Sequence, residues 1–570
     1  MAIRIAVMNF SDLKAPSSTT IAWCWVLALA VAIFNFALQG RLGMDMADEG
    51  FFYYGVLRVR AGDIPIADFQ AYEPYRYYWT AAWTWLTGDS LYAVRAATAV
   101  FGGLGLAAGL FAVARIIKTP WQLALIGLAI SWCNYYWYRQ FDTAVSLIAI
   151  WVAVRVAEHA TTRGAFTAGA LVGLIAGFGH NHGFYCAVVV LVVVIVMTWR
   201  VPRRDQLNIL ISYFIGIAVG YLPIVAHFLF VPHYFSTLWG SVVNELRTGS
   251  TNLALPVPWP WLVPVQFLEW PDAVYLLGIG VLFVAVPLTY GLAIVLLFLH
   301  FNRNDPVYRL LLASVTVGIL YLQHAFSRAD DVHLLEGIPA FIPTIVALLA
   351  LAERGAAWPW PRAILLAGIL PPFLLVNSLH LPRIIFLRSP PGAYALIDAN
   401  GSTLEVPKPV ANAIAALRKI KVSLLKPEQA MLVAPHWPMA YALLRQRSPI
   451  WEIYFLLPRS EAFQRHEISE LERQHLMFAI YADISLDGRS DRRLSLEQPL
   501  LYRYLSDNYA PIDGPELPEP YRLYRRTTPF PPSQAELLLS PVRPRPRVCK
   551  DRSGDITILR MGKSTHRIVG

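Results

Sequence analysis

Long apolar runs alternate with short polar connections over the first two thirds of the chain. A helix needs about 20 apolar residues to cross the hydrocarbon core of a bilayer, and several of these runs are shorter than that. The pattern predicts an all-α polytopic membrane bundle of about eleven transmembrane helices. The expected spans are Ile21–Leu38, Val94–Ala114, Trp121–Tyr136, Thr143–Ala157, Phe166–Phe178, Phe184–Trp199, Leu207–Leu229, Ala273–Leu299, Leu310–Gln323, Ile338–Ala352 and Ala363–Leu375.

The pattern changes near Pro382, after which no run of spanning length follows. The segments VPKPVANAIAALRKI, EAFQRHEISELERQHLMFAIYADI and DITILRM mix helical periodicity with strand-like alternation. We therefore expect two parts: a transmembrane module over residues 1–381, with a first outer loop at 40–90, and a soluble mixed α/β domain over 382–570. The Pro/Arg-rich stretch Ser540–Arg547 reads as a surface linker before one last strand.

Composition supports a membrane protein. Hydrophobic residues make up 56% of the chain and charged residues only 15%, against about a quarter in soluble domains. The formal charge of +10 suits basic cytoplasmic connections and would also suit an anionic lipid substrate. No glycine-rich phosphate loop is visible, and we expect no nucleic-acid partner. The four cysteines form no CxxC pair and suggest no disulfide framework.

Basic residues divide the connections into two classes. Lys and Arg gather on the cytoplasmic side of membrane proteins. With the N-terminus in the cytoplasm, alternate connections carry them, which places the C-terminal domain outside the cytoplasm. The basic residues of the inner connections are Arg115, Lys118, Arg155, Arg163, Arg200, Arg203, Arg204, Arg303, Arg309, Arg354 and Arg362. The first outer loop also contains bases, but its acids outnumber them, which indicates a folded site.

The same alternation brings four polar clusters to one side of the membrane. Ionisable groups within the membrane or at its edge cost free energy and are usually functional. The convergence of clusters that lie far apart in the sequence therefore predicts an extracytoplasmic active site. The clusters are Asp48-Glu49, then Arg139 and Asp142, then His180-Asn181-His182, then Arg328, Asp330, Asp331 and His333.

The first outer loop carries a recognisable motif. An acidic pair at Asp48-Glu49 is followed by the aromatic stretch Phe51–Arg60, a G-x-x-P-x-x-D-F segment at Gly62–Phe69 and a P-x-x-x-Y segment at Pro74–Tyr78. This order resembles the GT-C glycosyltransferases, with bacterial members related to aminoarabinose transferases and protein O-mannosyltransferases as the most similar group. Segments that begin at Phe326 and Ala434 also look like motifs of bacterial GT-C proteins.

The resemblance implies a reaction and a place for it. It implies an inverting transfer of a monosaccharide from a polyprenyl-phosphate donor to a lipid, glycan or protein acceptor outside the cytoplasm of a bacterium, at the inner membrane. It makes Asp48 the general base. Related enzymes often carry a lysine near the start of the span expected at Phe184–Trp199, whereas this chain has His180-Asn181-His182. The way the donor phosphate is held is therefore open.

Each acidic candidate has a simpler explanation beside the catalytic one. A carboxylate at the membrane edge can take the proton from an attacking hydroxyl, but acidic residues also suit a helix N-terminus. Asp48 is the stronger catalytic candidate. Glu49 can orient Asp48, bind the sugar or cap the helix. A single displacement needs one base rather than the two carboxylates of retaining hydrolases.

Basic side chains are candidates for holding the donor phosphate or its sugar. These are His180, His182, Arg139, Arg328 and His333, because imidazole and guanidinium groups bind phosphate oxygens. The alternatives are a polar turn for the histidines, a salt-bridged helix cap for the segment at Arg328, and an ion pair between Arg139 and Asp142.

A last set of side chains is a candidate for sugar or acceptor contacts. It consists of Tyr72, Glu73, Arg76 and Asp330. An aromatic belt at the membrane interface explains many of the neighbouring rings equally well, and Phe51–Arg60 and Tyr78–Leu86 are expected to lie flat as interfacial helices. No cofactor is required and no metal ligands are assigned. Mg²⁺ or Mn²⁺ stays open, because some GT-C relatives use one, although no DxD cluster demands it.

Three other functions compete with a transferase. A transporter or flippase for lipid-linked saccharides would show inverted repeats and broken spans in matching halves, which are not visible here. A polymerase or ligase would use a lipid-diphosphate donor and place its key bases in a late outer loop. A membrane sensor that binds glycans would need no catalytic carboxylate.

Overall fold

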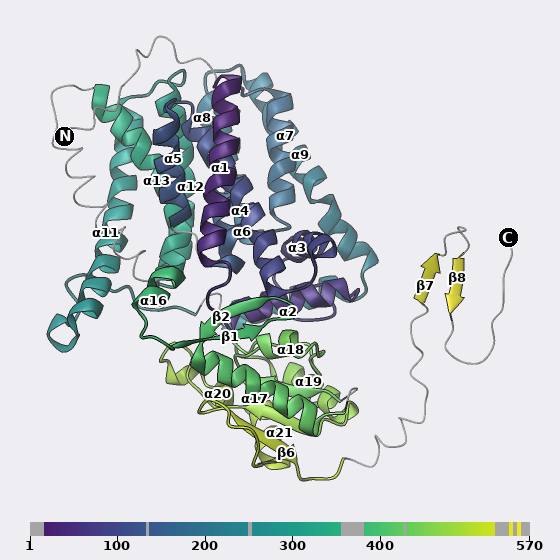
Figure 1. The fold of residues 1–570 in the computed structure, drawn as a ribbon. Helices are drawn as coiled ribbons and strands as arrows, with labels where there is room; N and C mark the ends of the chain where they lie inside the picture. The colour runs from purple at the N-terminus through teal and green to yellow at the C-terminus, as the bar shows by residue number, and fades with distance from the viewer. Residues whose placement is uncertain are drawn as a thin grey trace.

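The computed structural model describes residues 16–132, 136–248, 253–354, 381–426 and 429–530, and two short strands near the C-terminus. Figure 1 shows a bundle of long helices above a smaller domain of strands and helices. The bundle contains α1 (Ser18–Gln39), α4 (Leu91–Val113), α5 (Pro120–Trp132), α6 (Gln140–Glu158), α7 (Thr162–Ile175), α8 (His180–Thr198), α9 (Arg203–Phe230), α11 (Trp270–Leu299), α12 (Pro306–Ser327) and α13 (Asp331–Arg354).

The helices confirm the predicted polytopic fold. Within the described residues, eight are long and apolar enough to cross a membrane, and α5 and α7 are shorter apolar helices. Ten of the expected spans thus each coincide with a helix. The remaining one, Ala363–Leu375, lies outside the described residues.

The short helix α7 is held by close packing against α9. Glycines four apart on each helix face each other, in the small-xxx-small arrangement that lets membrane helices approach closely. A Cβ added at Gly169 would lie 2.1 Å from the Tyr213 carbonyl oxygen, and one at Gly220 would lie 2.0 Å from the Ala170 carbonyl oxygen. The fit explains how a helix of 14 residues keeps its place in the bundle.

Three helices lie at the end of the bundle nearest the smaller domain: α2 (Asp48–Arg60), α3 (Pro74–Thr87) and α10 (Tyr234–Thr248). The expectation that α2 lies flat at the lipid surface is wrong, because every residue from Glu49 to Val56 is buried. Eight consecutive buried residues leave no side of this part of α2 open to lipid. Helix α2 therefore fills the space between the bundle and the C-terminal domain.

The C-terminal domain is a mixed α/β domain, as predicted. Its main sheet has the order β3-β4-β6-β5, in which β3 and β4 are parallel and the other pairs antiparallel. The strand expected at DITILRM is β8, which pairs with β7. The elements are α16 (Pro382–Arg388), β1 (Tyr394–Asp398), β2 (Thr403–Pro407), α17 (Lys408–Leu424), β3 (Met431–Ala434), α18 (Met439–Leu443), α19 (Glu461–Arg473), β4 (Phe478–Tyr481), α20 (Leu494–Glu497), α21 (Pro499–Asn508), β5 (Tyr509–Pro511), β6 (Arg522–Arg526), β7 (Arg547–Lys550) and β8 (Ile556–Leu559).

Backbone contacts join this domain to the first outer loop. Gly43 N–H donates to the Glu405 carbonyl at 2.8 Å, and Glu405 N–H donates to the Arg41 carbonyl at 2.9 Å, so the loop extends the β1–β2 hairpin. A Cβ added at Gly50 would lie 2.4 Å from the backbone nitrogen of Met439. Helix α18 therefore rests directly on α2, two residues beyond Asp48.

Candidate active site

Asp48 opens helix α2 but does not cap it. The capping is done by Asp45, whose carboxylate accepts the Ala47 N–H at 2.9 Å and the Glu49 N–H at 3.2 Å. Burial, reinforced by the neighbouring Asp48 charge, raises the pKa of Asp45 to about 7. Asp45, and not Asp48, therefore caps the helix, and the Asp48 side chain can contact other groups.

The neighbours of Asp48 in the described residues are tyrosine hydroxyls. Tyr138 donates to Oδ2 of Asp48 at 3.1 Å. Burial and the charge of the nearby Asp48 raise the pKa of Tyr454, so this phenol stays protonated. Tyr138 comes from the 3₁₀ helix η2 (Trp137–Arg139) and Tyr454 from the C-terminal domain. The site is thus closed by both parts of the chain.

Glu49 has a different environment from its neighbour. Its two carboxylate oxygens each accept an N–H of Arg95 at 2.7 Å. Arg95, in the first turns of α4, also donates to the carbonyls of Gly40, Leu42 and Gly43. The side-chain exposure of Arg95 is 2%. The pair ties the chain that precedes α2 to α4, so the structure gives Glu49 a positioning contact.

A second cluster is centred on Asp142. Oδ1 of Asp142 lies 2.5 Å from Nη2 of Arg76 and 2.7 Å from Nε2 of His182. Nδ1 of His182 lies 2.8 Å from the Tyr321 hydroxyl, and Arg76 Nε donates to the Phe178 carbonyl. These contacts join α3, α6, α8 and α12 at the end of the bundle near the C-terminal domain.

The expected ion pair between Arg139 and Asp142 is not formed. Nη1 of Arg139 lies 2.7 Å from Oε1 of Glu336 on α13, and Nδ1 of His324 lies 3.3 Å from Oε2 of the same carboxylate. Asp142 sits in the first turn of α6, whereas Arg139 belongs to the 3₁₀ turn that precedes it, and each side chain meets a partner from another helix. Nε of Arg139 has no hydrogen-bond partner within the described part of the chain.

Tyr72 lies between Asp48 and the two arginines Arg76 and Arg139. Burial and the Asp48 charge raise its pKa, while the charges of Arg139 and Arg76 oppose that rise. The Tyr72 hydroxyl therefore lies within the field of the Asp48 carboxylate and of both arginines. Its backbone N–H donates to the Tyr77 hydroxyl at 3.0 Å, which fixes the loop before α3.

The remaining candidates form two smaller groups. Oε1 of Glu73 accepts the backbone N–H of His180 at 3.0 Å and lies 3.3 Å from Nδ1 of the same histidine. Burial alone would raise the pKa of Glu73. The contacts with His180 and the charge of Arg76 outweigh burial and lower this pKa to about 2. Nε2 of His180 lies 3.1 Å from the Tyr221 hydroxyl. His180 and His182, two residues apart, thus belong to different networks.

Arg328, Asp330 and His333 connect the bundle to the C-terminal domain. Nε of Arg328 lies 2.7 Å from Asp330 and its Nη2 lies 2.5 Å from Asp487 of that domain. Asp330 accepts the His333 N–H at 2.8 Å, which makes it the cap of α13. Contacts with His333 and Arg328 lower the pKa of Asp330 to about 2 in spite of its burial. The segment at Arg328 thus forms the salt-bridged helix cap that was the alternative to phosphate binding.

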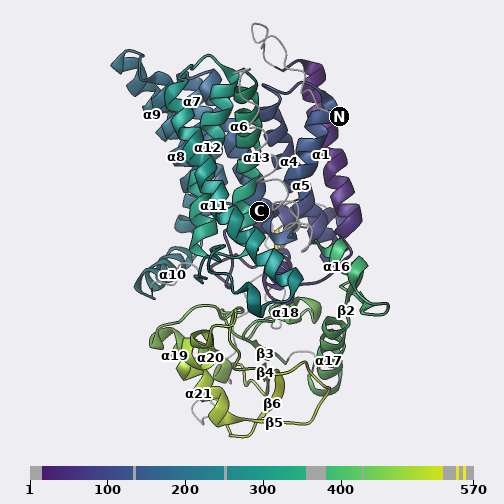
Figure 2. The same cartoon turned by 90° about the vertical axis from the view of Figure 1, so that its left-hand side faces the viewer.

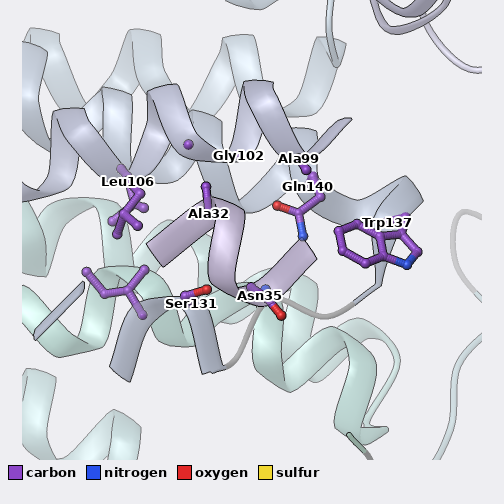
Figure 3. Close-up of a pocket in the computed structure, with 11 residues that line it drawn as sticks. Ala32, Asn35, Ala99, Gly102, Leu106, Ser131, Trp137 and Gln140 are labelled. Carbon is purple, nitrogen blue, oxygen red and sulfur yellow. The ribbon is translucent and has the colours of Figure 1, made fainter. Parts of the chain in front are cut away.

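Two hollows are candidates for a ligand. The first, among α1, α4, α5 and α6, is lined by Asn35, Gln140 and Ser131 and has a volume of about 20 Å³, enough for a water molecule but not for a sugar (Figure 3). The second has a volume of about 600 Å³ and lies between α10, the first outer loop and the C-terminal domain. That volume is in the range of small-molecule sites.

No metal centre is visible in the described ranges, where no group of three His, Cys, Asp or Glu side chains could hold an ion. Four residues of the site were not singled out from the sequence: Arg95, Tyr138, Glu336 and Tyr454. Arg95 and Glu336 are charged residues beside or within apolar runs, where a buried charge requires a partner. The tyrosines carry no such signal among many aromatic residues.

Comparison with known proteins gives a fold. The crystal structure of ArnT from Cupriavidus metallidurans bound to undecaprenyl phosphate is similar over 90% of this chain and 99% of that chain, with a TM-score of 0.50 and 14% sequence identity. The apo structure of the same protein covers 89% of this chain and 98% of its own, with a TM-score of 0.49 and 14% identity. No protein-family model and no curated protein sequence matches the chain.

Proposed function

We propose that this multi-pass membrane protein is a GT-C type glycosyltransferase that moves a monosaccharide from a polyprenyl phosphate to a hydroxyl of an extracytoplasmic acceptor. The observation that carries the proposal is the state of Asp48. Its side chain accepts a hydrogen bond from Tyr138 and lies near Tyr454, with no cation paired to it among the described residues, at the junction of the bundle and the C-terminal domain. The shared fold with ArnT, which was crystallised with undecaprenyl phosphate, supports the choice of donor.

The proposed reaction uses Asp48 as its base, because no cation is paired with this side chain in the described residues. Asp48 takes the proton of the acceptor hydroxyl as its oxygen attacks the anomeric carbon from the face opposite the phosphate. The bond from the anomeric carbon to the phosphate oxygen breaks, and the lipid phosphate leaves with the electron pair. One base is sufficient, and the product has inverted configuration. Glu49, held by Arg95, positions Asp48 through the shared first turn of α2.

Arg139 is our candidate for holding the donor phosphate. Arg76 and Arg95 are already engaged by carboxylates and backbone carbonyls, whereas Nε of Arg139 is buried and lacks a hydrogen-bond partner in the described residues. A guanidinium N–H suits a phosphate oxygen. His182, His333 and Arg328 hold the helices around it. Tyr72, Glu73, Arg76, His180 and Asp330 stay candidates for contacts with the sugar.

The orientation belongs to the same proposal. We propose that the N-terminus lies in the cytoplasm and the C-terminal domain outside it, at the inner membrane of a bacterium, and the distribution of basic residues among the connections supports this orientation. Sugars linked to polyprenyl phosphate then reach the site within the membrane plane. A requirement for Mg²⁺ or Mn²⁺ is tested by adding a chelator to the transfer assay described next.

The deciding experiment is transfer of radiolabelled sugar from a panel of polyprenyl-phosphate monosaccharides to membrane extracts. Wild type is compared with Asp48→Asn, which keeps the shape and removes the base. The matched control is Asp63→Asn, because Asp63 lies in the same loop but pairs with Arg58. Transfer by wild type and by Asp63→Asn, with loss in Asp48→Asn, supports the proposal.

Other outcomes would contradict it. Equal transfer by Asp48→Asn would move the base elsewhere. Labelled lipid that changes leaflet without transfer would support a flippase. Transfer only from lipid diphosphates would support a polymerase or ligase.

A further inference from the structure

A cleft of about 600 Å³ separates α10 from the C-terminal domain. Its walls come from three parts of the chain: the polar face of α10, Ala67 of the first outer loop, and the segment 451–467. Figure 2 shows α10 at the end of the bundle, beside the helices of the C-terminal domain. Asn244 donates to the Pro458 carbonyl at 2.9 Å and bridges two of these walls.

Helix α10 has two unlike faces. Phe235, Trp239, Val242 and Leu246, spaced by three or four residues, form an exposed apolar stripe, with Trp239 58% and Leu246 69% exposed. A helix with such a stripe and a polar opposite face lies in the surface plane of a bilayer. The cleft on its other side therefore opens at the membrane surface.

The polar face of α10 carries small side chains toward the cleft. Thr237, Gly240, Ser241 and Asn244 all line it. A Cβ added at Gly240 would meet no atom within 4 Å, so the space in front of it is open. The wall offers hydroxyl and amide groups without filling the cleft.

The opposite wall contains a buried carboxyl group with spare bonding capacity. Glu467 on α19 is 1% exposed, and its Oε1 has no hydrogen-bond partner in the residues that the structure describes. Oε2 accepts the Glu452 N–H at 3.2 Å. Burial beside the Glu452 charge raises the pKa of Glu467 to about 8, so the group is mainly protonated at neutral pH. A neutral carboxyl can both donate to and accept from a ligand hydroxyl.

Aromatic rings complete this wall. Trp451 and Phe463 meet edge to face with their centroids 6.0 Å apart, and both line the cleft. The guanidinium carbon of Arg459 lies 5.7 Å and 5.0 Å from the two ring centroids, while its Nε pairs with Glu452 at 2.8 Å. Apolar ring surface beside hydroxyl, amide and carboxyl groups matches a saccharide, whose C–H faces are apolar and whose edge is hydroxylated.

The cleft lies close to the candidate base. Trp451 lines the cleft, and Tyr454 lies close enough to Asp48 for the Asp48 charge, together with burial, to raise its pKa. The three residues of chain between Trp451 and Tyr454 span at most about 11 Å. Gln70 fixes both ends of this segment: its N–H donates to the Trp451 carbonyl at 3.0 Å, and its Oε1 accepts the Tyr454 N–H at 2.9 Å. A short saccharide held in the cleft can therefore reach toward Asp48.

We propose that this cleft binds the saccharide part of a membrane-anchored acceptor, with Glu467 and the polar face of α10 as its hydrogen-bonding groups. The inference rests on the proposed transferase function, which it deepens by naming the acceptor class. The apolar stripe of α10 puts the cleft at the bilayer surface, where the anchor of such an acceptor would lie. The hydroxyl, amide, carboxyl and aromatic groups of the cleft suit a saccharide.

Binding can be tested without any transfer reaction. The full chain in lipid nanodiscs, free of glycoside detergents, is probed by saturation-transfer NMR with methyl glycosides of glucose, galactose, mannose and N-acetylglucosamine. We expect at least one to bind wild type and Asp48→Asn equally. Gly240→Phe fills the cleft and should weaken that binding at least tenfold. The matched control, Val242→Phe, adds the same ring to the apolar face and should bind as wild type does.

A second variant addresses the carboxyl group. Glu467→Leu removes the unpartnered oxygen and should weaken binding, whereas Glu467→Gln keeps a donor and an acceptor and should retain most of it. Three results would overturn the inference: no glycoside bound by wild type, binding that survives Gly240→Phe, or binding that is lost in Asp48→Asn, which would place the sugar at the donor position. Because these readouts need no donor, a failed transfer assay leaves them interpretable.

Discussion

The guanidinium of Arg95 and the carboxylate of Glu49 form a buried pair joined by two hydrogen bonds of 2.7 Å. Replacing Arg95 by Met leaves the Glu49 charge without its partner in a site where the pair is almost unexposed. Loss of one member of a buried pair costs about 3–5 kcal/mol. We expect a clear fall in the unfolding temperature of Arg95→Met by fluorescence-monitored melting.

The control for that prediction is Arg58→Met, which breaks the pair with Asp63 near the end of α2. Both partners of that pair keep more solvent contact, with side-chain exposures of 18% and 16%, and Arg447 stays 3.6 Å from Asp63, so the loss should be smaller than that of Arg95→Met. Equal effects of the two substitutions would show that burial does not distinguish these ion pairs.

Arg139→Lys should weaken donor binding. Lysine keeps the positive charge facing Glu336 but loses the unpartnered Nε–H. A hydrogen bond to a charged group contributes about 1.5–3 kcal/mol, which corresponds to a rise of roughly 10- to 150-fold in the KM for the donor. Steady-state kinetics should show little change in the KM for the acceptor. A change confined to the acceptor KM would remove Arg139 from the phosphate site.

Gly50→Ala should disturb the contact between α2 and α18. The new Cβ would lie 2.4 Å from the Met439 backbone nitrogen, and backbone cannot yield as a flexible side chain can. Overpacking of this kind costs about 1–3 kcal/mol. Because Asp48 lies two residues away, transfer should fall together with the melting temperature. Gly240→Ala, which enters open space, is the control and should melt within a degree or two of wild type.

Glu467 should make the protein less stable as pH rises. Its pKa moves from an ordinary value of 4.5 to about 8 in the folded chain, so between these values the folded state holds a proton that the unfolded chain releases. Stability is lost across this window by up to about 1.4 kcal/mol per pH unit. Below pH 4.5 the group has no effect, and above pH 8 the cost is complete.

Melting temperatures of wild type and Glu467→Gln, measured from pH 5 to pH 8, isolate this effect. The difference between the two proteins should grow with pH in favour of the variant. Parallel curves would mean that Glu467 is ionised in the folded protein at neutral pH. Asp45, whose pKa is also raised, contributes in the same direction to both proteins and cancels from the difference.

The helices were predictable because the bilayer imposes a simple rule on the sequence. Each span must hide its backbone in a long apolar run, and ten expected runs became helices. The same rule leads to a wrong position for α2. Its aromatic run is typical of an interfacial helix, but the C-terminal domain packs against α2 and buries it.

Partners in the site could not be predicted in the same way. Asp142 is three residues from Arg139, which favours a local pair, but Arg76 and His182 reach it from elements far away in the sequence. Asp45 lies before α2 and Asp48 is its first residue, and only the backbone geometry decides that Asp45 caps the helix. Local spacing indicates which residues gather at one end of the bundle, but not which of them touch.

The pairing of the first outer loop with Glu405 bears on how the protein is made. Arg41 and Thr403, which also share a hydrogen bond, are 362 residues apart. During synthesis the early helices can enter the membrane long before the ribosome reaches the β1–β2 hairpin. The loop that bears Asp48 can form its backbone hydrogen bonds with the hairpin only after that point. A chain interrupted before the hairpin would lack these contacts, so the loop that bears Asp48 can reach its final arrangement only after about seven tenths of the chain has been made.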